Sequence, residues 1–236
     1  MQEIEGKMRS AIIKYSMIMP NDNIGVGLSG GKDSMVLLIA LAHLRNYLDI
    51  PFKLTAITVD PQFNGTKGDY SQCEELCNKL NVPYIIKRTH LAEIIFDQRK
   101  EGNPCSLCAR MRRGILHNIC NEQSCNRIAL GHHFDDAVQT FFMNLFEGGH
   151  IGCFSPVTYL SKKQLWLIRP MIFVEERDIK GAVRRNNIST VKSNCPVDGD
   201  TARNHYKNLI LQLEKQHPKL RKKVMGAMQR SHLDGF

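Results

Sequence analysis

A glycine-rich turn between two apolar segments limits most strongly the folds that this chain can adopt. The turn has the sequence LSGGKDS at residues 28–34, after the apolar run 23–28 and before a longer one at 35–44. This order predicts a strand, a tight turn and the start of a helix. Glycines let the backbone point its N–H groups at a ligand, and the helix adds the positive end of its dipole. The segment therefore predicts an anion site that suits phosphate.

Two better-known phosphate loops do not match this turn. A Walker loop has a glycine five residues before its Gly-Lys pair and a Ser or Thr after the lysine, but Val26 and Asp33 occupy those positions. The dinucleotide spacing G-x-G-x-x-G is present at Gly25, Gly27 and Gly30. The first two of these glycines fall inside the predicted strand and not in the turn after it, which disfavours dinucleotide binding.

The turn resembles the SGGxDS loop of the PP-loop ATP pyrophosphatases. Enzymes of that superfamily cleave ATP between its α and β phosphates and adenylate a carbonyl oxygen of a second substrate. The resemblance implies that four loop residues cradle the pyrophosphate: Ser29, Gly30, Gly31 and Ser34. It also implies that Lys32 neutralises phosphate charge and that Asp33 holds Mg²⁺ or orients the loop. A plain glycine turn with a Ser/Asp helix cap is the alternative.

Predicted strands alternate with predicted helices along most of the chain. The strands are predicted at 23–28, 52–60, 82–88, 127–131 and 165–168. This alternation indicates an α/β fold with a parallel five-stranded, Rossmann-like sheet and helices on both faces. In such sheets a ligand binds beyond the carboxyl ends of the strands, where the strand order reverses. Three segments are predicted at those ends: 29–34, 58–60 and 131–136.

The length of 236 residues suits one α/β domain with a small addition. We predict an N-terminal helix within 1–22, a PP-loop ATP-binding domain at 23–175, and a basic, mainly helical region at 176–236 with a short strand at 189–192. No apolar run approaches the roughly 20 residues that span a bilayer, and the first residues lack the apolar core of a signal peptide. A cytoplasmic protein with no membrane partner is therefore expected.

The positive charge is concentrated near the C-terminus. The net charge is +9, and residues 177–230 hold 13 Lys and Arg against 4 Asp and Glu, so the rest of the chain is neutral. A basic region beside a neutral nucleotide domain indicates a polyanionic partner. The alternative is a solvated basic helix face.

A second polar segment, GHHFDD at residues 131–136, follows the fourth predicted strand and opens a helix. Acidic side chains are stable at a helix start, so helix capping is one interpretation of the aspartates. The other is nucleotide and Mg²⁺ binding by carboxylates, with a histidine bonded to phosphate or substrate. A similar GHxxDD segment in PP-loop enzymes that act on tRNA favours this second interpretation. The residues expected at the nucleotide site beyond the first loop are Thr58, Gly131, His132, Asp135 and Asp136; those expected to act in catalysis are Lys32, Asp33 and Asp136.

Eight cysteines in a chain without a signal peptide argue against a disulfide framework. Cys105 and Cys108 form a C-x-x-C pair at the start of a predicted helix, whose positive end favours thiolates. The pair alone suits a redox dithiol, half of a zinc site or part of an iron–sulfur site. Cys195, in the basic region, is a third candidate ligand. Most of the other cysteines are expected to be buried thiols.

Four features in order resemble the TtcA family, whose members make 2-thiocytidine in tRNA. They are PCSLCARMRRGIL, IALGHHFDDAVQTFFMNLFEGG, IRPM and a C-terminal cysteine, and the resemblance extends over nearly the whole chain. The family binds a [4Fe–4S] cluster through cysteines that correspond to Cys105, Cys108 and Cys195. Three protein thiolates leave one iron open to a sulfur ligand, whereas structural zinc normally takes a fourth protein ligand. The second C-x-x-C-like pair of the family near the third ligand is absent here.

The resemblance implies ATP-dependent tRNA thiolation, in which the C2 oxygen of a cytidine is adenylated and then replaced by sulfur. It implies ATP, Mg²⁺ and a [4Fe–4S] cluster as cofactors, and tRNA and a sulfur donor (a cysteine desulfurase or sulfide) as partners; we also expect a homodimer. The side chains expected to contact tRNA phosphates are Arg110, Arg112, Arg113 and Arg203. Two alternatives stay open: modification of another base, such as uridine to 2-thiouridine, and a non-catalytic zinc or iron–sulfur RNA-binding module.

Overall fold

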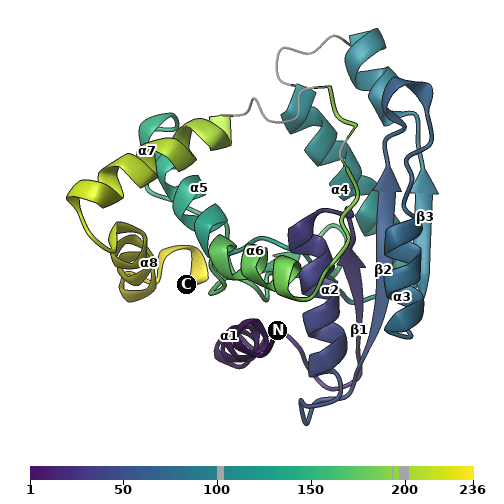
Figure 1. The fold of residues 1–236 in the computed structure, drawn as a ribbon, viewed down its shortest axis with the longest axis horizontal. Helices are drawn as coiled ribbons and strands as arrows, with labels where there is room; N and C mark the ends of the chain where they lie inside the picture. The colour runs from purple at the N-terminus through teal and green to yellow at the C-terminus, as the bar shows by residue number, and fades with distance from the viewer. Residues whose placement is uncertain (100–103, 193, 197–201) are drawn as a thin grey trace.

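The described residues form one six-stranded sheet, three strands of which are labelled at the right of Figure 1. The computed structural model describes residues 1–99, 104–192, 194–196 and 202–236. The strands are β1 (Asp22–Gly27), β2 (Phe52–Asp60), β3 (Tyr84–Arg88), β4 (Arg127–Ala129), β5 (Val157–Leu160) and β6 (Leu165–Ile168). Their order is β3-β2-β1-β4-β6-β5, and every pairing is parallel except that of β5 with β6. The α/β fold and its five parallel strands are therefore confirmed, with one antiparallel strand more than predicted.

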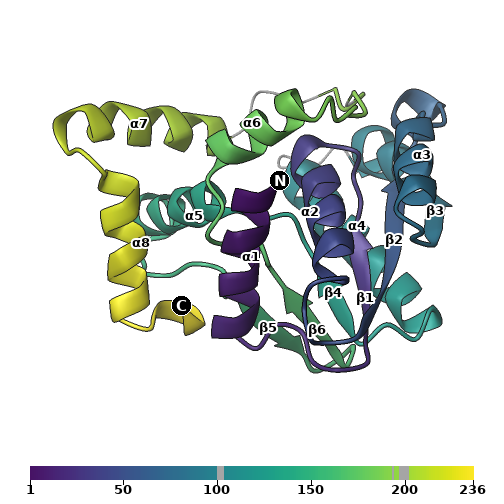
Figure 2. The ribbon, with the colours of Figure 1, turned by 60° about the horizontal axis from the view of Figure 1, so that its bottom comes forward.

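Helices cover both faces of the sheet (Figure 2). They are α1 (Gln2–Lys14), α2 (Lys32–Leu44), α3 (Ser71–Lys79), α4 (Pro104–Glu122), α5 (Phe134–Phe146), α6 (Glu176–Arg185), α7 (Ala202–Gln216) and α8 (Leu220–Arg230). Short helical turns lie at Phe63–Gly65, Glu93–Arg99 and Leu233–Gly235. In the part of the chain that the structure describes, no helix is both long enough and apolar enough to cross a membrane.

The side chains of β2 alternate between two apolar cores, as a strand buried on both faces requires. Leu54 and Ala56 belong to the larger core, which contains most of α2. Ile57 and Val59 belong to the smaller core, with Leu116 of α4. The continuous apolar run of β2 is thus the signature of a central strand covered by helices on both sides.

The N-terminal helix and the basic C-terminal region share the larger core with the segment 23–175. Met8 of α1, Ile210 of α7 and Met225 of α8 are all buried in it. Figure 2 shows α7 and α8 beside α5, at the end of the molecule away from β3. The domain boundaries at residues 22 and 175 stay predictions.

Two elements at the margins of the fold differ from the sequence-based prediction. The strand β5 was not predicted, because Gln164, with φ +51°, takes the left-handed conformation in the turn before β6 and no glycine marks it. The predicted strand at 189–192 is wrong. Its Val191 N–H donates a hydrogen bond to the Gly30 carbonyl, at 2.9 Å, so this β-branched segment covers the glycine loop and does not join the sheet.

A buried ion pair joins the amino ends of the two central strands. Asp22 begins β1, Arg127 begins β4, and their side chains, only 4% and 8% exposed, are bonded to each other. The Asp22 carboxylate also accepts the Met19 N–H at 2.6 Å and the Asn126 amide at 2.7 Å. A buried charge of this kind is stable only while its partners are present.

Removing the carboxylate tests this anchor. We expect Asp22→Ala to lower the free energy of unfolding by about 3 kcal/mol, because it leaves the Arg127 charge buried without its partner. Urea denaturation followed by circular dichroism measures the change. In the control Glu3→Ala, which breaks an exposed pair with Lys7, the loss should stay below about 0.5 kcal/mol. Equal losses in the two variants would contradict the assignment.

Candidate active site

The loop 28–34 is closed by its own hydroxyl groups. The Ser29 N–H donates to Ser34 Oγ at 3.1 Å, and Ser34 Oγ donates to the Gly31 carbonyl at 2.9 Å. The Gly31 N–H in turn donates to Ser29 Oγ at 3.3 Å. Gly31 is the N-cap of α2, so the first N–H groups of that helix have no partner within the helix and suit an anion.

Glycine is strongly favoured at position 30 of this loop. Its φ is +82°, and a Cβ atom placed on it would lie 2.6 Å from the Cβ of Val191. The segment around Val191 is bonded to the Gly30 carbonyl. The tight fit therefore joins the glycine loop to the C-terminal region.

The segment GHHFDD packs directly against this loop. A Cβ atom on Gly131 would lie 3.2 Å from the carbonyl carbon of Asp33 and 3.3 Å from the amide nitrogen of Ser34. The two segments follow β1 and β4, which are neighbours where the strand order reverses. The predicted meeting of residues 29–34 and 131–136 at one edge of the sheet is confirmed.

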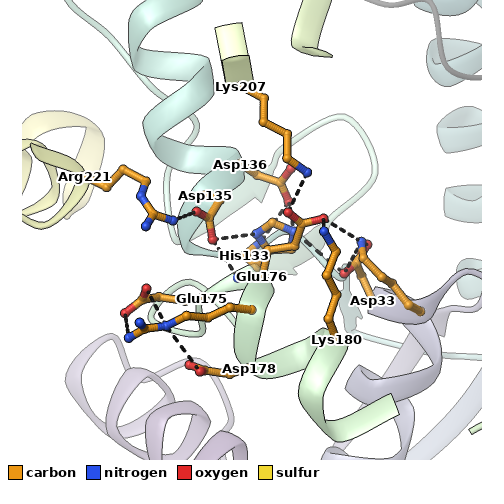
Figure 3. Close-up of polar contacts among 12 residues, drawn as sticks. Asp33, His133, Asp135, Asp136, Glu175, Glu176, Asp178, Lys180, Lys207 and Arg221 are labelled. Atoms are coloured by element: carbon orange, nitrogen blue, oxygen red, sulfur yellow. Dashed lines mark hydrogen bonds and ion pairs between the residues drawn. The ribbon is translucent and has the colours of Figure 1, made fainter. Parts of the chain in front are cut away.

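His133 lies among three carboxylates (Figure 3). Its Nε2 atom is 3.7 Å from Asp33 Oδ1 and 3.6 Å from Asp136 Oδ2, and its Nδ1 atom is 3.9 Å from Asp135 Oδ2. The sequence pattern led to the prediction of the neighbouring His132, and not of His133, as a residue of the nucleotide site. The only signal for it was its place in the GHHFDD segment, which does not tell which histidine turns toward the aspartates.

Asp135 and Asp136, at the start of α5, contact different partners (Figure 3). Asp136 lines a cavity with the glycine loop, accepts the His133 N–H at 3.0 Å and pairs with Arg203 at 3.0 Å. Asp135 pairs with Arg221 of α8 at 2.6 Å and accepts the backbone N–H of Glu176 at 2.6 Å. Successive residues of a helix point about 100° apart, which separates the two carboxylates. Of these two aspartates, Asp136 lines that cavity and Asp135 does not.

Lys32 extends from the loop between two carboxylates. Its Nζ atom is 2.9 Å from Asp33 Oδ2 and 3.3 Å from Glu176 Oε1. Burial alone would lower the pKa of Lys32, but these two carboxylates raise it above its ordinary value. Burial would raise the pKa of Glu176, but the hydrogen bond from Lys207, the charge of Lys32 and the hydrogen bond from Lys180 lower it to about 2. Both groups are therefore charged at neutral pH.

Two cavities open beside the loop, and Ser29 and Arg112 line both. The first, of about 540 Å³, extends along Asp60 and Tyr70 to Lys192. The second has a volume of about 510 Å³. Its polar lining includes Asp33, Gly131, His132, Asp136 and Arg203. Both volumes are in the range of small-molecule sites.

Thr58 lies beneath these cavities and lines neither of them. Its hydroxyl is fully buried, donates to the Leu28 carbonyl at 2.6 Å and accepts the Tyr84 hydroxyl at 2.9 Å. Thr58 thus fixes the junction of β1 with the loop. Its expected contact with the nucleotide stays a prediction.

His132 presents a neutral imidazole to the second cavity. Burial, followed by the charges of Arg169 and Arg203, lowers its pKa to about 3. The ring packs on Phe154, with 5.1 Å between the ring centres. Its Nδ1 atom is buried and has no hydrogen-bond partner among the residues that the structure describes. At neutral pH His132 can therefore contact a ligand only as an uncharged group.

Cys105 and Cys108 lie in the first turns of α4. Burial raises the pKa of Cys108, Arg112 lowers it, and the charges of Cys195 and Cys105 raise it, so each of these two thiols lies near Cys108. In the described parts of the chain, which leave out 100–103, 193 and 197–201, no three His, Cys, Asp or Glu side chains are grouped as a metal site. Three soft sulfur donors nevertheless suit an iron–sulfur cluster in kind.

The other five cysteines are Cys73, Cys77, Cys120, Cys125 and Cys153. The first four are buried and the fifth is half-buried. The expectation that most of these thiols belong to the core is confirmed.

The arginines expected to contact tRNA fall into two groups. Arg110 and Arg113 are exposed on α4. Arg112 is half-buried and lines both cavities, and Arg113 and Arg203 line the second. Contact of all four with tRNA stays a prediction, and three of them are also placed to act on a ligand in the cavities.

Comparison with known proteins identifies similar sequences. Residues 2–214 match a family model described as the PP-loop domain. The chain is 36% identical over 221 residues to the tRNA-cytidine(32) 2-sulfurtransferase of Syntrophotalea carbinolica. The aligned residues make up 92% of this chain and 85% of that protein. It is 33% identical over 230 residues to the protein of the same name from Geobacter sulfurreducens, over 96% of this chain and 89% of that one.

Solved structures with the same architecture include a tRNA thiolase. The U34-tRNA thiolase NcsA from Methanococcus maripaludis, solved with its [4Fe–4S] cluster, has a TM-score of 0.79 and 26% identity, over 97% of this chain and 77% of that chain. An NH3-dependent NAD synthetase from Campylobacter jejuni shares the fold alone, with a TM-score of 0.51 and 18% identity over 100% of this chain and 96% of that one.

A methyl group at Gly30 tests the packing of the loop. We expect Gly30→Ala to lower the free energy of unfolding by about 1 kcal/mol for its positive φ and by about 1 to 2 kcal/mol more for the overlap with Val191. Gly149→Ala is the control, because Gly149 has φ +61° and open space around its Cβ position. Thermal and urea unfolding give both values. A loss no greater at Gly30 than at Gly149 would refute the close contact.

Proposed function

We propose that this chain, which belongs to the PP-loop family of the tRNA-cytidine(32) 2-sulfurtransferases, uses ATP to replace the C2 oxygen of a tRNA base with sulfur. The observation that carries the proposal is the contact of the glycine loop with the GHHFDD segment, beside a C-x-x-C pair. The contact supplies an anion site with carboxylates, and the cysteines supply sulfur ligands.

The loop residues hold the triphosphate. The N–H groups at the start of α2 face the phosphates, and Lys32 balances the charge that develops on the leaving pyrophosphate. Asp33 and Asp136, which both approach His133 Nε2 within 3.7 Å, would hold Mg²⁺, and the ion would supply positive charge to offset that of the phosphates. Arg203, which pairs with Asp136, would then be released toward a phosphate of the substrate.

Each of the two cavities binds a different substrate. The adenosine of ATP occupies the cavity along Asp60 and Tyr70, and the target base enters the one lined by His132 and Asp136. The C2 oxygen of the base attacks the α phosphorus, and the bond from that phosphorus to the bridging oxygen breaks to release pyrophosphate. A sulfur nucleophile then adds at C2, and the C2–O bond breaks to release AMP. Adenylation thus converts a poor leaving group into a good one.

Cys105, Cys108 and Cys195 would hold the [4Fe–4S] cluster. A cluster bound by three thiolates keeps one iron open to an exogenous sulfur ligand. The chain's own part is to keep these three thiols at the amino end of α4, close to the cavity that Arg112 lines. A sulfur donor (sulfide or a cysteine desulfurase), a homodimer and a cytoplasmic location stay predictions.

A uridine is the second candidate for the target base. The solved neighbour NcsA is a U34-tRNA thiolase, and its structure covers 97% of this chain. Cytidine and uridine share the C2 carbonyl group, so the adenylation step is the same for both. The sequence relatives favour cytidine at position 32.

Separate measurement of the two half-reactions tests the proposal. The wild-type protein, reconstituted anaerobically, is incubated with tRNA, Mg–ATP and sulfide; we expect pyrophosphate release and 2-thiocytidine at position 32, detected by nucleoside mass spectrometry. Lys32→Ala and Asp33→Ala should each slow pyrophosphate release roughly 100-fold or more, because both act on the phosphates.

The cysteine variant provides the complementary result. We expect Cys195→Ser to retain tRNA-dependent pyrophosphate release but to form no thionucleoside. Thiolation by Cys195→Ser would refute the cluster assignment. Pyrophosphate release at the wild-type rate by Asp33→Ala would refute the role of the loop. Thiouridine instead of thiocytidine would select the second candidate.

A further inference from the structure

Three ammonium groups from three different elements share the carboxylate of Glu176 (Figure 3). Lys32 of the loop lies 3.3 Å from it, Lys180 of α6 lies 3.2 Å from it, and Lys207 of α7 lies 2.6 Å from it. The Glu176 side chain is only 16% exposed. One carboxylate among three cations fixes their positions, because each cation would otherwise repel the other two.

The position of Glu176 is itself fixed. It is the first residue of α6, and its backbone N–H donates to Asp135 Oδ2 at 2.6 Å. The larger apolar core contains residues of both α6 and α2. Glu176 therefore reaches Lys32 from a rigid element that lies opposite the loop.

Helix α7 contacts the site at two points one turn apart. Arg203 pairs with Asp136 at 3.0 Å, and Lys207 pairs with Glu176 at 2.6 Å. Residues four apart lie on the same face of a helix. Helix α7 thus pairs both with Asp136, which lines the second cavity, and with Glu176, which pairs with Lys32.

We propose that Glu176 is a positioning residue that holds the Lys32 ammonium in place for the leaving pyrophosphate, and that Lys207 acts through Glu176. This inference rests on the proposed function only for the predicted effect of Glu176 on the rate of pyrophosphate release. A lysine that is out of place by about 1 Å loses much of its effect on a transition state. Glu176 also adds a negative charge near the phosphates, so its loss should not weaken ATP binding.

The substitution Glu176→Gln removes the charge and keeps the shape. We expect kcat for tRNA-dependent pyrophosphate release to fall at least about 10-fold, with KM for ATP not raised. The matched control is Glu175→Gln, since the neighbouring, even less exposed carboxylate pairs with Arg177 and Lys222 and not with Lys32. Because Glu175 does not contact Lys32, the kcat of this variant should stay within about 3-fold of the wild type. A local collapse of the loop would instead raise KM for ATP together with the fall in kcat, and that outcome would overturn the inference.

A second readout does not depend on activity. Acetylation of Lys32 by an amine-reactive ester, mapped by peptide mass spectrometry, should be at least 3-fold faster in Glu176→Gln than in the wild type or in Glu175→Gln. Equal labelling in Glu176→Gln and the wild type would overturn the inference, whether or not pyrophosphate is released. An absence of pyrophosphate release by the wild type, with faster labelling in the variant, would refute only the proposed function.

A double-mutant cycle tests the part assigned to Lys207. If Lys207 acts through Glu176, the single variant Lys207→Met should lower kcat. In the double variant with Glu176→Gln, Lys207→Met should cause no further fall in kcat. Lys215→Met, an exposed lysine on the same helix, is the control and should leave kcat unchanged. Full additivity of Lys207→Met and Glu176→Gln would overturn this part of the proposal.

Discussion

The close contact between the loop 28–34 and the segment after β4 determines the geometry of the site. Both segments leave the sheet where its strand order reverses, and Gly131 lacks the side chain that would hold them apart. At the other end of the same two strands, the ion pair of Asp22 and Arg127 fixes their relative position. Because β1 and β4 are held at both ends, Asp33 and Asp136 approach the same nitrogen of His133.

The positive charge of the C-terminal region has a role inside the molecule. Arg203, Lys207 and Arg221 pair with Asp136, Glu176 and Asp135, all of which lie at or behind the site. These cations therefore hold the catalytic segments as well as raising the net charge. Cations that are paired inside the site in the free protein can turn to phosphates of a bound polyanion, since the two kinds of partner are chemically alike. In the proposed function, the C-terminal region would thereby connect recognition of RNA with the arrangement of the glycine loop.

Local sequence signals predicted the parts of the fold that depend on local order. The glycine loop, the five parallel strands and the GHHFDD segment were found from spacing and apolar periodicity, because each is set by neighbours along the chain. Contacts between distant segments gave no such signal. His133, Glu176 and the docking of Val191 on Gly30 all depend on which elements the tertiary fold brings together.

The different directions of Asp135 and Asp136 were not predictable from the sequence for the same reason. Their adjacent positions in the sequence indicated a shared role, but the helical turn directs Asp136 to the cavity beside the loop and Asp135 to Arg221. A sequence pattern gives the residue types of a site, and the direction of each side chain follows only from the helix that carries it. By contrast, the family resemblance did indicate that Cys195 lies near Cys108, although 86 residues separate them.

The central claim is that ATP activates the base by transfer of AMP to its C2 oxygen. The most direct test uses a tRNA whose target base carries ¹⁸O at C2, with the wild-type protein, Mg–ATP and a sulfur donor. Mass spectrometry of the released nucleotide then locates the oxygen. The account predicts AMP that contains the ¹⁸O label in its phosphate, together with unlabelled pyrophosphate. Unlabelled AMP formed in step with the thionucleoside would contradict it.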